Sequence, residues 1–156
     1  TDVDAQAAVP ATVKVAAGAG FVADTTAPLA ERFKLDLTAG TLSVKYEQPV
    51  DGSQVDPTKF TLTSTITGAV STHTLSAECT TTQAVATWFT MTLTKTDLDE
   101  IKKLDVCSAA NAEAGCWLWF GAGSVVDATG LPIVSIADTA ADSALPCIEC
   151  VCSSCI

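Results

Sequence analysis

The sequence contains few positively charged residues, a single histidine and a single asparagine. Lysine and arginine number 8 against 18 aspartates and glutamates, which gives a formal net charge of −10 at pH 7. A chain this acidic offers no basic patch to nucleic acid or anionic lipid, so we expect no nucleic-acid partner. Because one histidine and one asparagine leave few residues for catalysis, we also predict that the protein is not an enzyme and needs no cofactor.

A long hydrophobic run is also lacking. The longest uncharged apolar stretch, residues 114–126, contains three glycines and is about 13 residues long, whereas a membrane-spanning helix needs about 20. We therefore expect no membrane span. No basic segment precedes an apolar one near the N-terminus, so we expect any signal peptide to have been removed.

Cysteine, in contrast, is abundant, with seven residues in the chain. This number is typical of an oxidising compartment, and we predict a secreted, extracellular or cell-surface protein. Cys107 and Cys116 bracket a short polar loop and form the preferred internal disulfide, which would stabilise the fold by about 2–3 kcal/mol. The remaining candidates are Cys79, Cys147, Cys150, Cys152 and Cys155.

The four cysteines within 147–155 leave several pairings open. Their spacing, Cys-x-x-Cys-x-Cys-x-x-Cys, also occurs where thiolates bind zinc. No pair of matching spacing lies elsewhere, so we favour disulfides and expect no metal. The pairings left open are among these four cysteines, with Cys79, Cys107 or Cys116, or with another chain. Because the total is odd, one cysteine is either a free thiol or bonded to a group outside this chain.

Alternation of apolar residues with threonine predicts strands. Phe60, Leu62 and Ile66 share one face of residues 60–66, and Phe89, Met91 and Leu93 share one face of 89–94. Further strands are predicted at 33–37, 41–47, 71–79, 116–126 and 132–137. About seven short strands separated by turns indicate an all-β protein, a β-sandwich.

One segment departs from this pattern. Within residues 96–105, Leu98, Ile101 and Leu104 recur at helical spacing. Acidic residues fill the first turn, and two lysines, Lys102 and Lys103, lie near the end, which suits the helix dipole. We predict a short crossover helix there, capped by Thr96 or Asp97. The chain as a whole divides into an N-terminal arm and linker (1–27), the sandwich (28–137) and a cysteine-rich C-terminal tail (138–156).

Three motifs occur in an order that resembles a known family. They are Asp24-Thr-Thr-Ala-Pro28, the strand end Tyr46-Glu-Gln-Pro-Val-Asp51, and the turn Asp127-Ala-Thr-Gly-Leu-Pro132. Over residues 24–137 the chain resembles the bacterial immunoglobulin-like (SbsA-like Ig) repeats of surface-layer and adhesin proteins. The resemblance implies an immunoglobulin-like β-sandwich that acts as a spacer, an adhesive module or a polymer subunit, and no catalytic residues.

The arm looks like a strand without a sheet of its own. In tandem arrays of such repeats, the segment before the Asp-Thr-Thr motif is the last strand of the preceding domain, and residues 11–15 occupy that place. An unpaired strand tends to add to an open sheet edge. We therefore predict a homopolymer, a filament joined head to tail through the arm residues Val13, Val15, Phe21 and Val22. The alternatives are an arm that packs on its own domain or is a disordered end, or a spacer or adhesin module that binds carbohydrate or protein.

Two further groups of residues suggest contacts with partners. Trp117 and Trp119 lie opposite Leu118 and Phe120 on one strand, and with Trp88 they need cover from the predicted helix or from another subunit. The outward threonines have β-branched side chains that favour strands, but they also offer sites for O-glycosylation. These are Thr61, Thr63, Thr65, Thr90 and Thr92.

The lone histidine, His73, lies in a Thr-His-Thr sequence without a nucleophile motif beside it. The acidic clusters lack the spacing of a calcium-binding loop, so we interpret them as solvated surface.

Overall fold

A computed structural model describes residues 24–65, 71–107, 115–136 and 144–152. These residues form eight strands, one α-helix and two short 3-10 helices. The strands are β1 (Ala30–Asp36), β2 (Thr41–Asp51), β3 (Phe60–Thr63), β4 (Thr72–Thr74), β5 (Thr80–Thr81), β6 (Val85–Thr92), β7 (Trp117–Phe120) and β8 (Leu145–Val151). The helices are α1 (Lys95–Lys103), η1 (Gly52–Gln54) and η2 (Pro57–Lys59).

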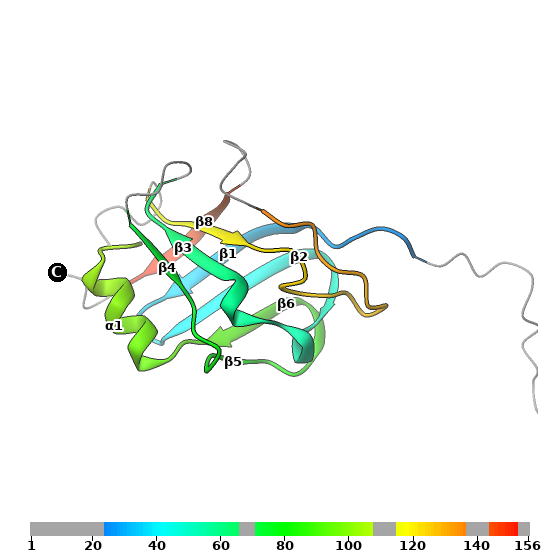
Figure 1. Cartoon of the computed structure of the whole chain (residues 1–156), viewed down its shortest axis with the longest axis horizontal. Helices are drawn as coiled ribbons and strands as arrows, with labels where there is room; N and C mark the ends of the chain where they lie inside the picture. The colour runs from blue at the N-terminus through cyan, green and yellow to red at the C-terminus, as the bar shows by residue number, and fades with distance from the viewer. Residues whose placement is uncertain (1–23, 66–70, 108–114, 137–143, 153–156) are drawn as a thin grey trace, which may run out of the picture.

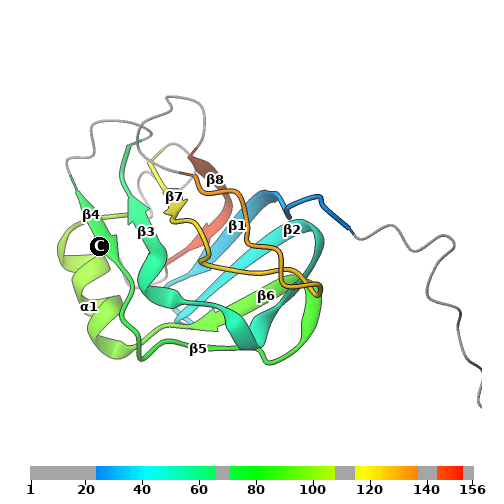
Figure 2. The ribbon, with the colours of Figure 1, turned by 45° about the vertical axis from the view of Figure 1, so that its right-hand side comes forward.

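All eight strands belong to one curled sheet in the order β4-β3-β7-β8-β1-β2-β6-β5. Every pair is antiparallel except β1 and β8, which run in the same direction. Strand β8 joins the two halves, because Leu145 and Pro146 pair with β7 whereas Cys147–Val151 pair with β1. As a result β3, β4 and β7 form one layer and β1, β2 and β6 another (Figures 1 and 2).

The core lies between these layers and contains the apolar residues that alternation predicts. Phe33 and Leu35 of β1 and Leu62 of β3 are fully or almost fully buried. Phe60 of β3 contacts rings from both layers, with ring centres 6.0 Å from Phe89 and 5.7 Å from Phe120. Burying a side chain of this size contributes about 1.5–3 kcal/mol, so the aromatic contacts fix the layers face to face.

The predicted helix is confirmed as α1, although its cap differs. Thr94 is the N-cap, because its Oγ1 accepts a hydrogen bond from the backbone N–H of Asp97 at 3.0 Å. The prediction of Thr96 or Asp97 as the cap was wrong, since both lie inside the first turn. Ile101 is buried, and Leu98 packs against the core. The helix therefore covers one end of the space between the layers (Figure 2).

Two glycines allow the turns of β2. Gly40 has a φ of 71° in the turn between β1 and β2, a conformation that other residues rarely adopt. At the other end of β2, a Cβ on Gly52 would collide with the carbonyl oxygen of Thr82. Both positions therefore require glycine.

An all-β chain with one short helix is confirmed, but the strands differ in detail from those predicted. Residues 132–136 form single bridges, Pro132 with Val126 and Ile136 with Phe120, instead of a strand. Strand β8 was not predicted, and it lies within the segment 138–156 that was set apart as a tail. The division into arm, sandwich and tail, like the arm itself (1–27), stays a prediction.

Candidate functional site

Two disulfides meet where β7 and β8 begin. Cys107 bonds to Cys116, as the short loop between them predicts, with their Cα atoms 4.4 Å apart. Cys147 bonds to Cys150 within β8, with a Cα–Cα distance of 6.1 Å. The backbone N–H of Cys147 also donates to the carbonyl oxygen of Cys116 at 3.2 Å. We call these four residues the cystine seam, and their bonds fit an oxidising compartment.

The sulfur atoms of the cystine seam converge. Those of Cys116, Cys147 and Cys150 all lie within 4.8 Å of one another, and Cys107 is bonded to the first of them. Cys116 is fully buried, and Cys107 and Cys147 are almost so. Cys152 is also disulfide-bonded, and Cys155 lies outside the described residues.

The remaining cysteine, Cys79, is a buried thiol. Its Sγ donates to Oδ2 of Asp97 at 3.2 Å. Burial raises the pKa of the Cys79 thiol, and the neighbouring Asp97 carboxylate raises it further. The thiol therefore stays protonated near neutral pH and is a poor nucleophile.

Asp97, at the start of α1, is the most highly connected polar side chain in the described structure. The carboxylate is 2% exposed and accepts hydrogen bonds from the Ser76 hydroxyl at 2.7 Å, the Ser76 N–H at 3.1 Å and the Thr94 hydroxyl at 2.6 Å. His73 Nε2 lies 2.8 Å from Oδ1. We call His73, Ser76, Cys79, Thr94 and Asp97 the carboxylate corner.

The carboxylate corner holds Asp97 in its charged form. Burial alone raises the pKa of this carboxyl, but the hydrogen bonds from Thr94, Ser76, His73 and Cys79 lower it by more, so that it lies well below its usual range. An ionised carboxylate only accepts hydrogen bonds, which places the imidazole hydrogen on Nε2 of His73.

The contacts of the carboxylate corner connect secondary-structure elements, and they do not activate a serine or cysteine as a nucleophile. A catalytic histidine takes a proton from a serine or cysteine to which it is hydrogen-bonded. Here Ser76 and Cys79 both donate to Asp97, and the described contacts bring neither of them to His73. The carboxylate therefore links β4, the turn after it and α1 to one another. The Thr94-x-x-Asp97 spacing, which resembles a capping box with aspartate in place of glutamate, is the sequence signal for this role.

The three tryptophans do not form one patch. Trp117 and Trp119 lie on β7, where they pair with Thr63 and Thr61 of β3, whereas Trp88 lies on β6 in the other half of the sheet. Trp119 is only 9% exposed, and its indole N–H has no acceptor among the described residues.

The predicted outward threonines differ in accessibility. Thr63 is fully buried, and its hydroxyl donates to the carbonyl oxygen of Thr65 at 3.1 Å. Thr61 and Thr90 are half-buried and bond to the hydroxyls of Thr74 and Ser43, each at 2.8 Å. Thr92 is exposed. An exposed hydroxyl is a better site for a glycan than an enclosed one, so Thr92 is the most accessible of the five.

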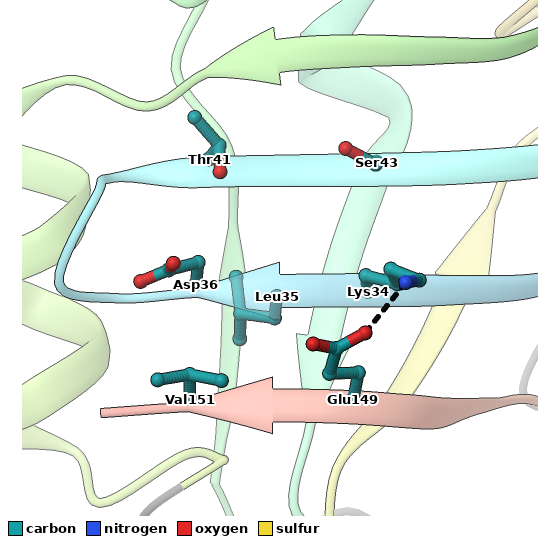
Figure 3. Close-up of a pocket in the computed structure, with 7 residues that line it drawn as sticks. All are labelled: Lys34, Leu35, Asp36, Thr41, Ser43, Glu149 and Val151. Carbon is teal, nitrogen blue, oxygen red and sulfur yellow. Dashed lines mark hydrogen bonds and ion pairs between the residues drawn. The ribbon is translucent and has the colours of Figure 1, made fainter. Parts of the chain in front are cut away.

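A shallow depression lies on the outer face of β1, β2 and β8 (Figure 3). Its volume is about 200 Å³, and its lining is mostly polar, from Lys34, Asp36, Thr41, Ser43, Glu149 and Val151. The ammonium group of Lys34 and the carboxylate of Glu149 point toward each other and form an ion pair at 2.5 Å. Trp88 lies close by, because its ring centre is 5.9 Å from the Lys34 Nζ.

The predicted arm residues Val13, Val15, Phe21 and Val22 lie outside the described residues, so their role stays a prediction. Among the residues that the structure does describe, no helix is both long and apolar enough to cross a membrane. Comparisons of the chain with family models, curated proteins and solved structures find no match.

Proposed function

We propose that the chain is an immunoglobulin-like structural subunit of an extracellular filament or surface appendage. Residues 11–15 of one copy insert as a strand into the sandwich of the next, so that copies assemble head to tail. The SbsA-like repeat pattern of residues 24–137 is the sequence basis of the proposal.

The direction of β1 and β8 is the observation that carries this proposal. The two strands are neighbours and run in parallel, so the chain enters β1 at one end of the domain and leaves β8 at the opposite end. In Figure 1, β8 accordingly runs toward the end of the long axis where α1 lies, whereas the blue segment that leads into β1 lies toward the opposite end. An arm that leaves one end of the domain and enters a sheet of the next copy makes a head-to-tail contact, and repetition of this contact builds an open, non-closing polymer.

The sheet also offers edges to which a strand could add. Its end strands are β4, with three residues, and β5, with two. Thr72 and Thr74 of β4 are exposed, and β4 pairs only with β3 among the described strands. Because the edge strands are short, two sheets do not readily pair edge to edge. An extended arm from another copy could still add to such an edge as a strand.

The disulfides support an extracellular setting for such a subunit. The cystine seam fixes β8 and the start of β7, the region where the two halves of the sheet join. Disulfides persist outside the cell and stabilise the fold there, because they limit the conformations of the unfolded chain.

The assembly can be tested with the full chain and two variants. In the first, Val13→Lys and Val15→Lys place charges on the arm, where they would have to enter a neighbouring sheet. In the matched control, Val134→Lys changes a side chain that is 52% exposed in the described fold. We expect filaments by negative-stain electron microscopy and concentration-dependent mass by light scattering for the natural chain and the control. The arm variant should stay monomeric. A natural chain that is monomeric at every concentration, or an arm variant that assembles equally well, would overturn the proposal.

An adhesin or spacer module is the second candidate function. The polar depression beside Lys34 and Trp88 favours it, because sugars bind to hydrogen-bonding side chains next to aromatic rings. A glycan array probed with the natural chain and with Trp88→Ala tests this function. Binding that the substitution removes would support it, and absence of binding to any glycan would contradict it.

A further inference from the structure

We propose that the four cysteines of the cystine seam form a metal site when they are reduced. The site takes a soft or borderline divalent cation, of which Zn²⁺ is the obvious member, and it does not depend on the proposed assembly. Oxidation to the two disulfides closes it.

The fold brings three of the ligands together from distant parts of the chain. Cys116 precedes β7 and Cys147 lies opposite it on β8, held there by the backbone hydrogen bond between them. Cys150 lies three residues after Cys147 on the same strand, and the three sulfur atoms lie within 4.8 Å of one another. Zinc–thiolate bonds of about 2.3 Å in a tetrahedron place sulfur atoms about 3.8 Å apart. The Cys116 sulfur would have to approach by up to about 1 Å, and the bonded sulfurs of Cys147 and Cys150, about 2 Å apart, would have to separate by about 2 Å after reduction.

Cys107 supplies the fourth ligand. Its disulfide holds it next to Cys116, at the end of the turn that follows α1. Reduction frees its sulfur to move away from that of Cys116 to an ordinary ligand spacing. The resulting set contains two pairs, Cys107 with Cys116 and Cys147 with Cys150. This is the complementary pair that the spacing within 147–155 lacks when only the sequence is read.

The surroundings suit a cation of this class. Cys107, Cys116 and Cys147 are buried. A buried thiolate is unfavourable when it is free, but a bound cation offsets its negative charge. Thiolate ligands select zinc and related metals over Mg²⁺ and Ca²⁺. The net charge of −10 also attracts cations to the molecule.

The chemistry balances as follows. A dithiol or a phosphine reduces each disulfide with two electrons and two protons, so the four thiols require four of each. One divalent ion then binds the sulfurs as thiolates and displaces their protons to solvent. Reoxidation by a disulfide or by dioxygen removes the electrons, re-forms the two cystines and releases the metal.

The experiment uses the full chain, reduced with a phosphine without oxygen and then freed of reductant. Titration with Co²⁺ reports the ligands, because tetrahedral cobalt thiolates absorb strongly in the visible and near-ultraviolet. We expect one Co²⁺ per chain, displaced by Zn²⁺, and no such absorption from the oxidised chain. An oxidised chain that gives the same spectrum would overturn the proposal.

Variants separate this site from one made by the tail alone. Cys116→Ser should weaken Co²⁺ binding at least tenfold. Cys79→Ser, which replaces a buried thiol outside the seam, should leave binding unchanged, and so should Cys152→Ser. Loss of binding in Cys152→Ser with full binding in Cys116→Ser would place the metal on residues 147–155 and contradict the proposal.

Alkylation gives a readout that does not depend on how well each variant folds. The reduced natural chain is treated with iodoacetamide, with and without Zn²⁺, and the modified cysteines are identified by mass spectrometry. We expect Zn²⁺ to slow modification of Cys107, Cys116, Cys147 and Cys150 together. Equal modification with and without Zn²⁺, or protection of Cys152 in place of Cys116, would overturn the proposal.

Discussion

The cystine seam and the carboxylate corner hold the two ends of α1 in different ways. After the C-terminal end of the helix, Cys107 is tied covalently to Cys116 at the start of β7. At the N-terminal end, Asp97 binds β4 and the turn after it through hydrogen bonds alone. A disulfide acts mainly by limiting the unfolded chain, whereas a buried carboxylate stabilises only the folded state. One end of the helix should therefore respond to reductant and the other to pH.

The largest effect is expected from Asp97→Asn. The substitution keeps the size of the side chain but places an amide among donors that now lack a charged acceptor. Removing one partner from a buried charged network costs about 3–5 kcal/mol of unfolding free energy. Urea denaturation measures it, with Asp99→Asn on the exposed side of the same helix as control. A loss below about 1 kcal/mol would show that the corner contributes little.

Acid should weaken the carboxylate corner but not the cystine seam. The pKa of Asp97 is lower in the folded chain than in the unfolded one, where it lies near 3.9, so the unfolded state takes up the proton first as pH falls. The stability that Asp97 contributes is complete above about pH 5 and declines as the pH falls below that value. Urea midpoints between pH 6 and pH 3 measure this decline, which should be smaller in Asp97→Asn. Parallel curves for the two proteins would contradict the assignment.

Removing the disulfide of the seam should have the next largest effect. Cys107→Ser with Cys116→Ser opens a loop with a sequence separation of 9, worth roughly 2–3 kcal/mol in the chain-entropy model. The loss should be the same at pH 6 and pH 3.5, in contrast to that of Asp97. Thermal unfolding of the double variant and of the natural chain tests this. A loss that changes with pH would mean that the two regions are coupled.

The smallest effect is expected from the helix cap. Thr94→Ala removes the acceptor for the Asp97 N–H and one donor to its carboxylate, and caps of this kind contribute about 1–2 kcal/mol. Lys95→Ala, which removes an exposed ion pair with Asp99, should change stability by less than about 0.5 kcal/mol. If the two substitutions have equal effects, the cap does not support the corner.

The two regions also differ in how well the sequence predicts them. Strands such as β3 and β6, the helix, and the disulfide of Cys107 with Cys116 follow from spacing within short segments. Strand β8 does not, because its alternation is interrupted by a register shift and its main partner, β1, lies more than a hundred residues earlier. The partners of Asp97 were likewise hidden, since only the fold brings His73 and Ser76 to the helix.

Tryptophan positions illustrate the same limit. Trp88 and Trp117 look equivalent as aromatic residues in predicted strands. Strand order separates them, because β6 lies beyond β2 in one layer and β7 lies between β3 and β8 in the other. Periodicity shows which residues share a face of one strand, but it does not show which strands are neighbours.

The proposed assembly rests on where residues 11–15 bind, and one cross-linking measurement tests this directly. Val13→p-benzoylphenylalanine places a photoreactive group in the arm. Equal amounts of ¹⁴N- and ¹⁵N-labelled variant are unfolded together, refolded and irradiated, and the cross-linked peptides are identified by mass spectrometry. We predict peptides that join a ¹⁴N arm to a ¹⁵N strand and the reverse, mapped to a sheet edge. Cross-links found only within chains of one label, or none to the strands of the sheet, would contradict assembly by strand insertion.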